Sequence, residues 1–150
     1  MNNREALKYA MDLCSSRERC RSEVTEKLIS HNISPGEIEK ILETLEKENF
    51  IDEVRYAGTF TRDKLRFNKW GKIKIRHMLQ GKKLPESIIT GALEEIEGDD
   101  YTGILREELI KKRKSIKGSN AFDLRGKLFR FARQRGFEPD VIYPLLDEII

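Results

Sequence analysis

One apolar pattern occurs three times along this chain of 150 residues. The second copy lies 51 residues after the first, and the third lies 53 residues after the second. The three copies are Val24, Leu28, Ile33, Ile38, Ile41, Leu42 and Leu45; Ile75, Leu79, Leu84, Ile89, Ala92, Leu93 and Ile96; and Leu128, Ala132, Phe137, Ile142, Leu145, Leu146 and Ile149. Seven positions kept in phase predict three copies of one structural unit.

Each copy predicts a pair of helices. A spacing of four, as in Val24 and Leu28, and a spacing of i, i+3, i+4, i+7, as in Ile38 to Leu45, each mark one face of a helix. A further helix is expected before each pair, at about residues 4–14, 53–67 and 100–114. We therefore expect an all-α fold of three tandem three-helix repeats in an elongated array that can curve. The expected repeats are residues 1–51, 52–98 and 99–150.

The ends of the expected helices carry residues that begin helices. Ser34 is expected to cap the third helix of the first unit, because a proline and a capping-box glutamate follow it. Asp52, and either Asp99 or Asp100, are expected to cap the first helices of the second and third units. The segment GSN, residues 118–120, is expected to be a short linker.

A basic segment occupies residues 64–83, KLRFNKWGKIKIRHMLQGKK, with eight basic residues and no acidic residue. Its centre, KIKI, alternates as a strand does, but the repeat aligns Ile75 with helix positions of the other two units. A helix is therefore expected, and on it Lys72, Arg76 and Lys83 fall within about 40° of one another. They predict a cationic stripe, which is either a contact surface or a solvated helix face.

Charge is segregated along the chain, although the net charge is only +3. Residues 37–53 contain seven acids and two bases, and residues 94–108 contain seven acids and one base. Residues 111–135 contain ten bases and one acid. This distribution predicts separate positive and negative surfaces, the positive ones suited to nucleic acid or to an acidic protein.

Several aromatic and basic residues of the middle unit allow two interpretations. Trp70 either packs at a turn or stacks on a base or a partner side chain. Tyr56 and Phe60 lie four apart and are expected in the core. Arg55 and Arg62 lie seven apart on one helical face, where they either form ion pairs or contact a partner.

The sequence offers little for catalysis or metal binding. Cys14 and Cys20 are six apart, a spacing that fits no zinc site, so we expect reduced, structural thiols. There is no glycine-rich phosphate loop and no evident nucleophile with a base. We expect no enzyme activity, no cofactor and no metal. Because no apolar stretch is long enough for a membrane span, we expect a cytoplasmic protein without a membrane partner.

The segment DEVRYAGTFTRDKLRFNKWGKIKIRHML, residues 52–79, resembles the signature of the RecX family, regulators of the bacterial recombinase RecA. The signature has an acidic pair, an arginine before an aromatic residue and alanine, a phenylalanine, an arginine, an aromatic–glycine pair and a helix. Its places are held by Asp52, Glu53, Arg55, Tyr56, Ala57, Phe60, Arg62, Trp70, Gly71, Ile75, Arg76 and Leu79. Lys69 departs from the signature, because many members have glycine there.

The resemblance implies a non-enzymatic regulator of DNA repair and recombination that lodges in the groove of the RecA filament. It would inhibit or modulate recombinase, ATPase and co-protease activities. We expect a monomer that binds single- and double-stranded DNA only weakly and without sequence preference. The alternative is a helix-turn-helix-like protein that binds duplex DNA directly through the helix at residues 71–82. The residues predicted to contact the partner or DNA are Arg55, Tyr56, Arg62, Arg66, Lys69, Trp70, Lys72, Arg76, Lys83, Lys111, Lys112, Arg113, Arg130 and Arg133.

Overall fold

The computed structural model describes residues 1–118 and 120–150, and these residues form nine α-helices and no strand. The helices are α1 (Asn3–Ser16), α2 (Arg21–Ser30), α3 (Pro35–Lys47), α4 (Glu53–Asn68), α5 (Lys72–Gly81), α6 (Glu86–Glu94), α7 (Gly98–Ser115), α8 (Ala121–Gln134) and α9 (Pro139–Ile149). The all-helical prediction is confirmed, and KIKI lies in α5. The expected linker at 118–120 includes residue 119, which lies outside the described residues.

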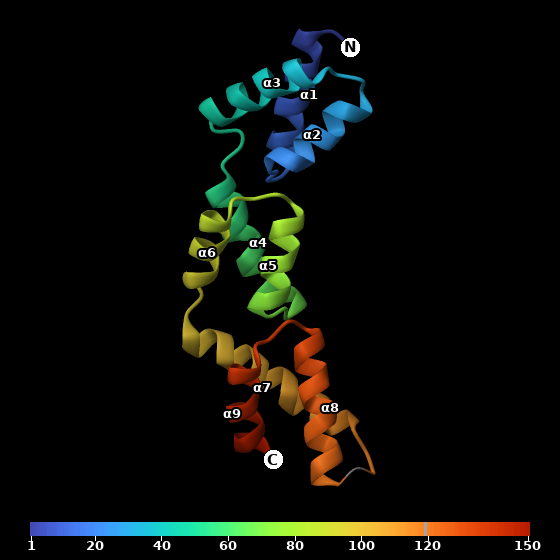
Figure 1. The fold of residues 1–150 in the computed structure, drawn as a ribbon, viewed down its shortest axis with the longest axis vertical. Coiled ribbons are helices and arrows are strands. Elements are labelled where there is room, and N and C mark those ends of the chain that lie inside the picture. Colours follow the sequence, from blue (N-terminus) through green and yellow to red (C-terminus); the bar gives the residue numbers. More distant parts are fainter. Residues whose placement is uncertain (119) are drawn as a thin grey trace.

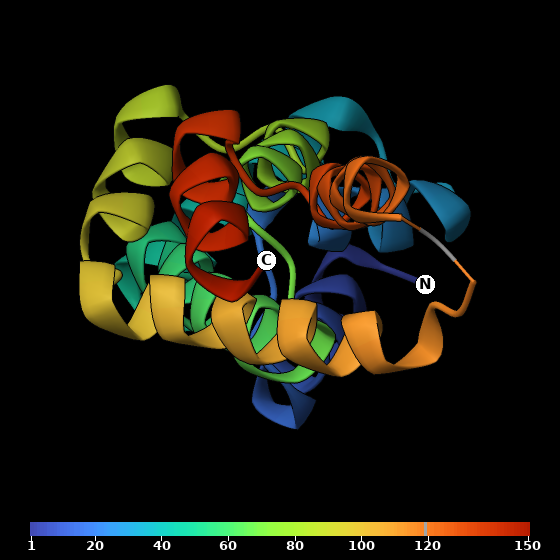
Figure 2. The same cartoon turned by 90° about the horizontal axis from the view of Figure 1, so that it is seen from below.

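The nine helices of the described chain form three units that follow one another along the long axis (Figure 1). We name them unit 1 (α1–α3), unit 2 (α4–α6) and unit 3 (α7–α9). The two chain ends lie at opposite ends of the elongated molecule. Viewed along the long axis, the units overlap, with α7 lying across the near end beside α8 and α9 (Figure 2).

Capping residues begin several helices where the sequence predicts them. Ser34 and Asp52 each accept a backbone N–H from the first turns of α3 and α4. α7 differs because it begins at Gly98, so Asp99 and Asp100 lie within its first turn. The predicted cap at Asp99 or Asp100 is therefore wrong. Both carboxylates instead stabilise α7, because they lie at the positive N-terminal end of the helix dipole.

The buried apolar side chains of the described residues form two clusters. One belongs to unit 1 and includes Val24, Leu28 and Leu45. The other runs through units 2 and 3 together and includes Ile75 and Leu128. Unit 1 contributes Cys20 to that second cluster. Units 2 and 3 therefore share one hydrophobic core, whereas unit 1 has a core of its own.

The middle helices of the three units stack head to tail, α2 on α5 and α5 on α8 (Figure 1). At the first junction, Ser22 Oγ near the start of α2 donates to the carbonyl of Lys82, which ends α5, at 2.7 Å. At the second, the Gly71 N–H at the start of α5 donates to the carbonyl of Arg135, which ends α8, at 2.7 Å. Aligned helix dipoles and paired helix ends stabilise both junctions.

The junction between units 2 and 3 is a backbone-to-backbone contact. Besides the Gly71 bond, the Ile73 N–H donates to the Gly136 carbonyl at 3.0 Å. A Cβ added to Gly71 would lie 2.4 Å from backbone atoms of Gly136, and one added to Gly136 would lie 2.3 Å from Lys74 Cβ. Gly136 also has φ +94°, a left-handed conformation that favours glycine. Two glycines therefore allow α5 and α8 to meet.

Tyr101 of α7 also joins units 2 and 3. Its side chain is buried, and its hydroxyl accepts the Lys72 N–H at 2.8 Å and donates to Glu138. Burial and the hydrogen bond to Glu138 raise the pKa of Tyr101, so the hydroxyl stays protonated and keeps donating. One hydroxyl thereby links the start of α5 to the start of α9.

The junction between units 1 and 2 is made by side chains. Glu23 accepts from Lys82 Nζ at 3.0 Å, and Arg55 donates twice to Glu18, at 2.8 and 2.9 Å. Burial opposes ionisation of Glu23, but hydrogen bonds from Lys82 and the Cys20 N–H outweigh it and lower the Glu23 pKa. This junction therefore depends on charged pairs rather than on backbone contact.

The middle helix of unit 3 is one turn longer than its counterparts at the N-terminus. The repeat aligns Lys72, the first residue of α5, with Arg125, whereas α8 begins four residues earlier at Ala121. Leu124 is the counterpart of Gly71. The Leu124 N–H donates within the helix to the Asn120 carbonyl at 2.9 Å. The N–H that corresponds to the junction donor of Gly71 is therefore already paired in unit 3.

Gly71→Ala tests the backbone contact. We expect it to lower the free energy of unfolding by at least about 2 kcal/mol, because its Cβ would collide with backbone that cannot move aside locally. The matched control is Gly91→Ala in α6, where an added Cβ meets nothing within 4 Å. That variant should be about 0.4–1 kcal/mol more stable than the parent. Urea unfolding measures both, and an unchanged stability for Gly71→Ala would refute the contact.

Tyr101→Phe tests the buried hydroxyl. It leaves the Lys72 N–H without its acceptor and Glu138 without its donor, so we expect a loss of about 1–3 kcal/mol in the free energy of unfolding. Tyr143→Phe is the control, because Tyr143 is 47% exposed, and its effect should stay within about 0.5 kcal/mol. Equal effects of the two changes in thermal or urea unfolding would contradict the assigned role.

Candidate functional site

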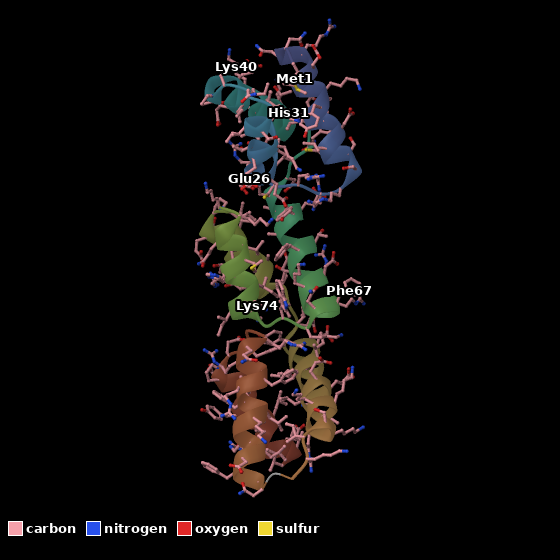
Figure 3. All side chains as sticks on the ribbon, turned by 90° about the vertical axis from the view of Figure 1, so that its right-hand side faces the viewer. Met1, Glu26, His31, Lys40, Phe67 and Lys74 are labelled. Atoms are coloured by element: carbon pink, nitrogen blue, oxygen red, sulfur yellow. The ribbon has the colours of Figure 1, made fainter. Side chains whose placement is uncertain are left out.

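The chain turns sharply where α4 ends. Lys69 follows the helix with φ +57°, a left-handed conformation that favours glycine. Many proteins with the signature described above have glycine at this position. This turn brings the Trp70 N–H back to the Lys64 carbonyl at 3.1 Å. The basic segment therefore folds onto itself at Lys69 and Trp70, and Figure 3 shows the neighbouring Phe67 and Lys74 in the middle of the molecule.

Trp70 is half-buried and carries two cations. Lys64 Nζ lies 5.1 Å and Lys74 Nζ lies 4.5 Å from the ring centroid. The two lysines come from different helices, α4 and α5. Trp70 therefore packs at the turn, as one of its two interpretations expects, and its ring also carries two cations of its own chain. Stacking on a base or a partner side chain stays a prediction.

Phe131 of α8 carries two cations in the same way. Lys112 Nζ, near the end of α7, lies 5.5 Å from the ring centroid, and the Arg135 guanidinium carbon lies 4.8 Å from it. The two basic blocks of the sequence thus produce the same local arrangement, an aromatic ring with two cations near its centroid.

Arg135 joins the two aromatic groups into one surface. Its carbonyl accepts the Gly71 N–H, and its guanidinium donates to the Asn68 carbonyl at 3.4 Å and to Glu108 at 3.4 Å. Glu108 also lies 3.9 Å from Lys111. We define the junction patch as the residues Lys64, Lys69, Trp70, Lys74, Lys111, Lys112, Phe131 and Arg135.

The junction patch keeps most of its positive charge. Among its contacts in the described chain, Glu108 is the one carboxylate that pairs with it, and that side chain is 14% exposed. A ring face positions a cation without neutralising it, at about 0.5–1 kcal/mol for an exposed pair. Six cations, of which Lys111 and Arg135 share one acid, form a surface that attracts phosphate or carboxylate groups.

Half of the junction patch is predicted from sequence. Lys69, Trp70, Lys111 and Lys112 are among the predicted contact residues, whereas Lys64, Lys74, Phe131 and Arg135 are not. The missed residues lie within the two basic segments, but only the junction between α5 and α8 brings those segments together. The repeat alignment, which places glycines at both sides of that junction, is the signal that could have indicated it.

The predicted cationic stripe is not a continuous helix face. α5 ends at Gly81, so Lys83 lies in the following turn with φ +63° rather than on the helix. Arg76 pairs with Glu86. The Lys72 ammonium lies 4.9 Å from the Tyr101 ring centroid. The prediction of a continuous stripe on one helix face is therefore wrong, because α5 ends before Lys83.

The predicted residues of α4 differ in their surroundings. Arg55 binds Glu18 of unit 1, as the ion-pair interpretation expects. Tyr56 is 5% exposed and stacks on Phe60 at 6.0 Å between centroids, which places both rings in or against the core. The Arg62 and Arg66 side chains are exposed, and both line a hollow of about 590 Å³ between α4 and α7.

The remaining predicted arginines lie on unit 3. Arg113 donates to the Ile149 carbonyl, and Arg133 donates to the Phe137 carbonyl at 2.9 Å. Arg113 therefore binds the C-terminal end of α9, and Arg133 binds the turn that precedes α9. Arg130 is exposed on α8.

The thiols and the acidic groups show no arrangement for metal chemistry. Burial raises the pKa of both Cys14 and Cys20, so the thiols stay protonated. In the described part of the chain, no group of three or more Asp, Glu, His or Cys side chains could hold a metal ion. Over the same residues, no helix is long and apolar enough to cross a membrane.

Models of three protein domains match this chain, one for each unit. The RecX first three-helix domain matches residues 6–45, the second matches residues 52–93 and the third matches residues 99–146. The resemblance found in residues 52–79 therefore extends over nearly the whole chain.

Individual relatives agree with the domain models. The regulatory protein RecX of Prosthecochloris aestuarii is 32% identical over 99% of this chain and 96% of its own length. That of Chlorobium phaeobacteroides is 31% identical over 99% of this chain and 95% of its own. A crystal structure of RecX from Lactobacillus salivarius shares the fold, with a TM-score of 0.91 and 21% identity over 98% of this chain and 96% of that one. A crystal structure titled regulatory protein RecX gives a TM-score of 0.90 and 22% identity over 97% of this chain and 73% of that one. This chain therefore belongs to the RecX family of regulatory proteins.

Proposed function

We propose that this protein binds the filament that a RecA-type recombinase forms on DNA and regulates it without catalysing a reaction. Two observations support the proposal: the membership of a family whose relatives are named regulatory proteins, and the junction patch. The junction patch is the main support for the proposal, because it gathers cations around two aromatic rings at one place along an elongated array.

The proposed contact is between the junction patch and phosphates or acidic side chains lining a filament groove. A groove is long and narrow, so an array of units offers more contact than a globular domain of equal size. Lys69, Lys74 and Lys112 would attract the anionic groups, and binding there would limit filament growth and lower its ATPase, strand-exchange and co-protease activities. Arg62, Arg66 and Arg130, which are exposed, would extend the contact surface.

Direct reading of duplex DNA by α5 is the second candidate, but the junction disfavours it. A recognition helix contacts base edges with residues near its N-terminus. In α5 that end is occupied: Gly71 is buried, and its N–H and that of Ile73 bind α8. Sequence-specific protection of a duplex site in footprinting would favour this candidate over the filament.

The proposal is tested by measuring the rate of ATP hydrolysis by a RecA-type recombinase on single-stranded DNA. The parent protein should lower the rate, and the variant Lys69→Gln, Lys74→Gln, Lys112→Gln should lower it much less. The control replaces Lys27, Lys40 and Lys47 of unit 1 by Gln, which removes the same charge from exposed positions outside the patch. Figure 3 shows Lys40 at the end of the molecule away from Lys74. The control should inhibit as the parent does. Unchanged ATPase in the presence of excess parent protein would refute the proposal.

The salt dependence of DNA binding separates phosphate contact from protein contact. If the junction patch meets phosphate, the patch variant should reduce the log–log slope by up to about 0.7–0.9 for each lost contact. Trp70 is the single tryptophan of the chain, so its fluorescence reports directly on DNA at the patch. Inhibition that depends on the patch, with no change of slope or fluorescence on DNA, would assign the contact to the recombinase.

A further inference from the structure

A second surface, separate from the junction patch, lies at the end of the molecule opposite unit 1. It is a hollow of about 330 Å³ on α8 and α9, lined by the rings of Phe122, Phe129 and Tyr143. Phe122 is 85% exposed in the first turn of α8, and Tyr143 is 47% exposed. Phe129 packs against the core, but a ring as exposed as Phe122 has no core function.

Two of the three rings of this hollow stack on each other. Phe129 and Tyr143 stack with centroids 4.9 Å apart and planes at 16°. The Arg125 guanidinium carbon lies 5.9 Å from the Tyr143 centroid, and a bond of 2.8 Å to Asp147 holds the guanidinium there. Tyr143 is therefore already in contact with Phe129 and Arg125, whereas Phe122, at 85% exposed, is the ring that a flat ligand can reach.

The hollow is also positive. Arg125, Lys127 and Arg130 line it together with Asp123, and Asp147 pairs with Arg125, so three cations face two acids. Gly126 lies at its wall, where an added Cβ would be 3.4 Å from a guanidinium nitrogen of Arg130. The exposed Arg130 thus lies against the wall of the hollow. The surroundings therefore favour a ligand that combines flat rings with negative charge.

We propose that this hollow, the unit-3 groove, binds single-stranded nucleic acid, with a base on Phe122 and a phosphate at Arg130. Bases in a duplex are already stacked on each other, whereas a single strand can offer them to aromatic side chains. The charge excess favours a phosphate backbone over a neutral peptide. Because α8 rises about 1.5 Å per residue, Phe122 and Arg135 are about 20 Å apart, so several nucleotides could reach from the groove to the junction patch.

The experiment compares fluorescence anisotropy of a labelled oligothymidylate with that of an abasic strand of equal length, with no recombinase present. Phe122→Ala should weaken oligothymidylate binding roughly five-fold or more, the loss of one base stack, and leave abasic-strand binding unchanged. Ile29→Ala, an exposed apolar change in unit 1, is the control and should alter neither. Because Phe122 is 85% exposed, the fold should survive, which circular dichroism checks.

The same titrations distinguish this proposal from the proposed function. The patch variant, with Lys69, Lys74 and Lys112 changed to Gln, should weaken both strands alike and lower the salt slope, whereas Phe122→Ala leaves the slope unchanged. Equal affinity of Phe122→Ala and parent for oligothymidylate would overturn the unit-3 groove. So would an equal loss on the abasic strand, or duplex binding with the same dependence on Phe122. A failed ATPase test alone would leave the groove standing.

Discussion

The backbone contact between Gly71 and Gly136 is the constraint on which the rest of the structure depends. It pairs N–H groups at the start of α5 with carbonyls at the end of α8, groups that would otherwise be buried without partners. Because neither residue has a Cβ, the helices approach closely enough for units 2 and 3 to share one core. The same approach places Arg135 beside the turn at Trp70, and so the junction patch exists only because the two glycines meet.

The two junctions have one geometry and different chemistry. At the equivalent positions of the first junction, Cys20 and Lys83 replace the two glycines, and the contact is made by Ser22 Oγ and charged pairs. Charged pairs in partial contact with water contribute less than buried backbone bonds and weaken with salt. The array is therefore firm where it carries the junction patch and more dependent on ionic conditions where unit 1 joins it.

The helices and repeats could be predicted from sequence because they follow from local rules. Apolar spacing fixes which face is buried, and residues such as Ser34 and Asp52 begin helices through their own side chains. The junction patch could be predicted only in part, since Phe131 and Arg135 meet Trp70 through a contact between distant segments. The stripe containing Lys83 failed because a turn of positive φ, not the helical period, decides where that side chain points. The cap expected at Asp99 or Asp100 failed for a simpler reason, since α7 begins before them.

The additional first turn of α8 makes the outer end of unit 3 differ from the two junctions. In the two preceding units, the start of the middle helix receives the next unit, but in unit 3 the corresponding donor of Leu124 is already bound within the helix. A unit docked in the register of the two junctions would meet this additional turn instead of an unpaired N–H. The contact that joins the three units therefore cannot be repeated at Leu124 without unwinding the first turn of α8.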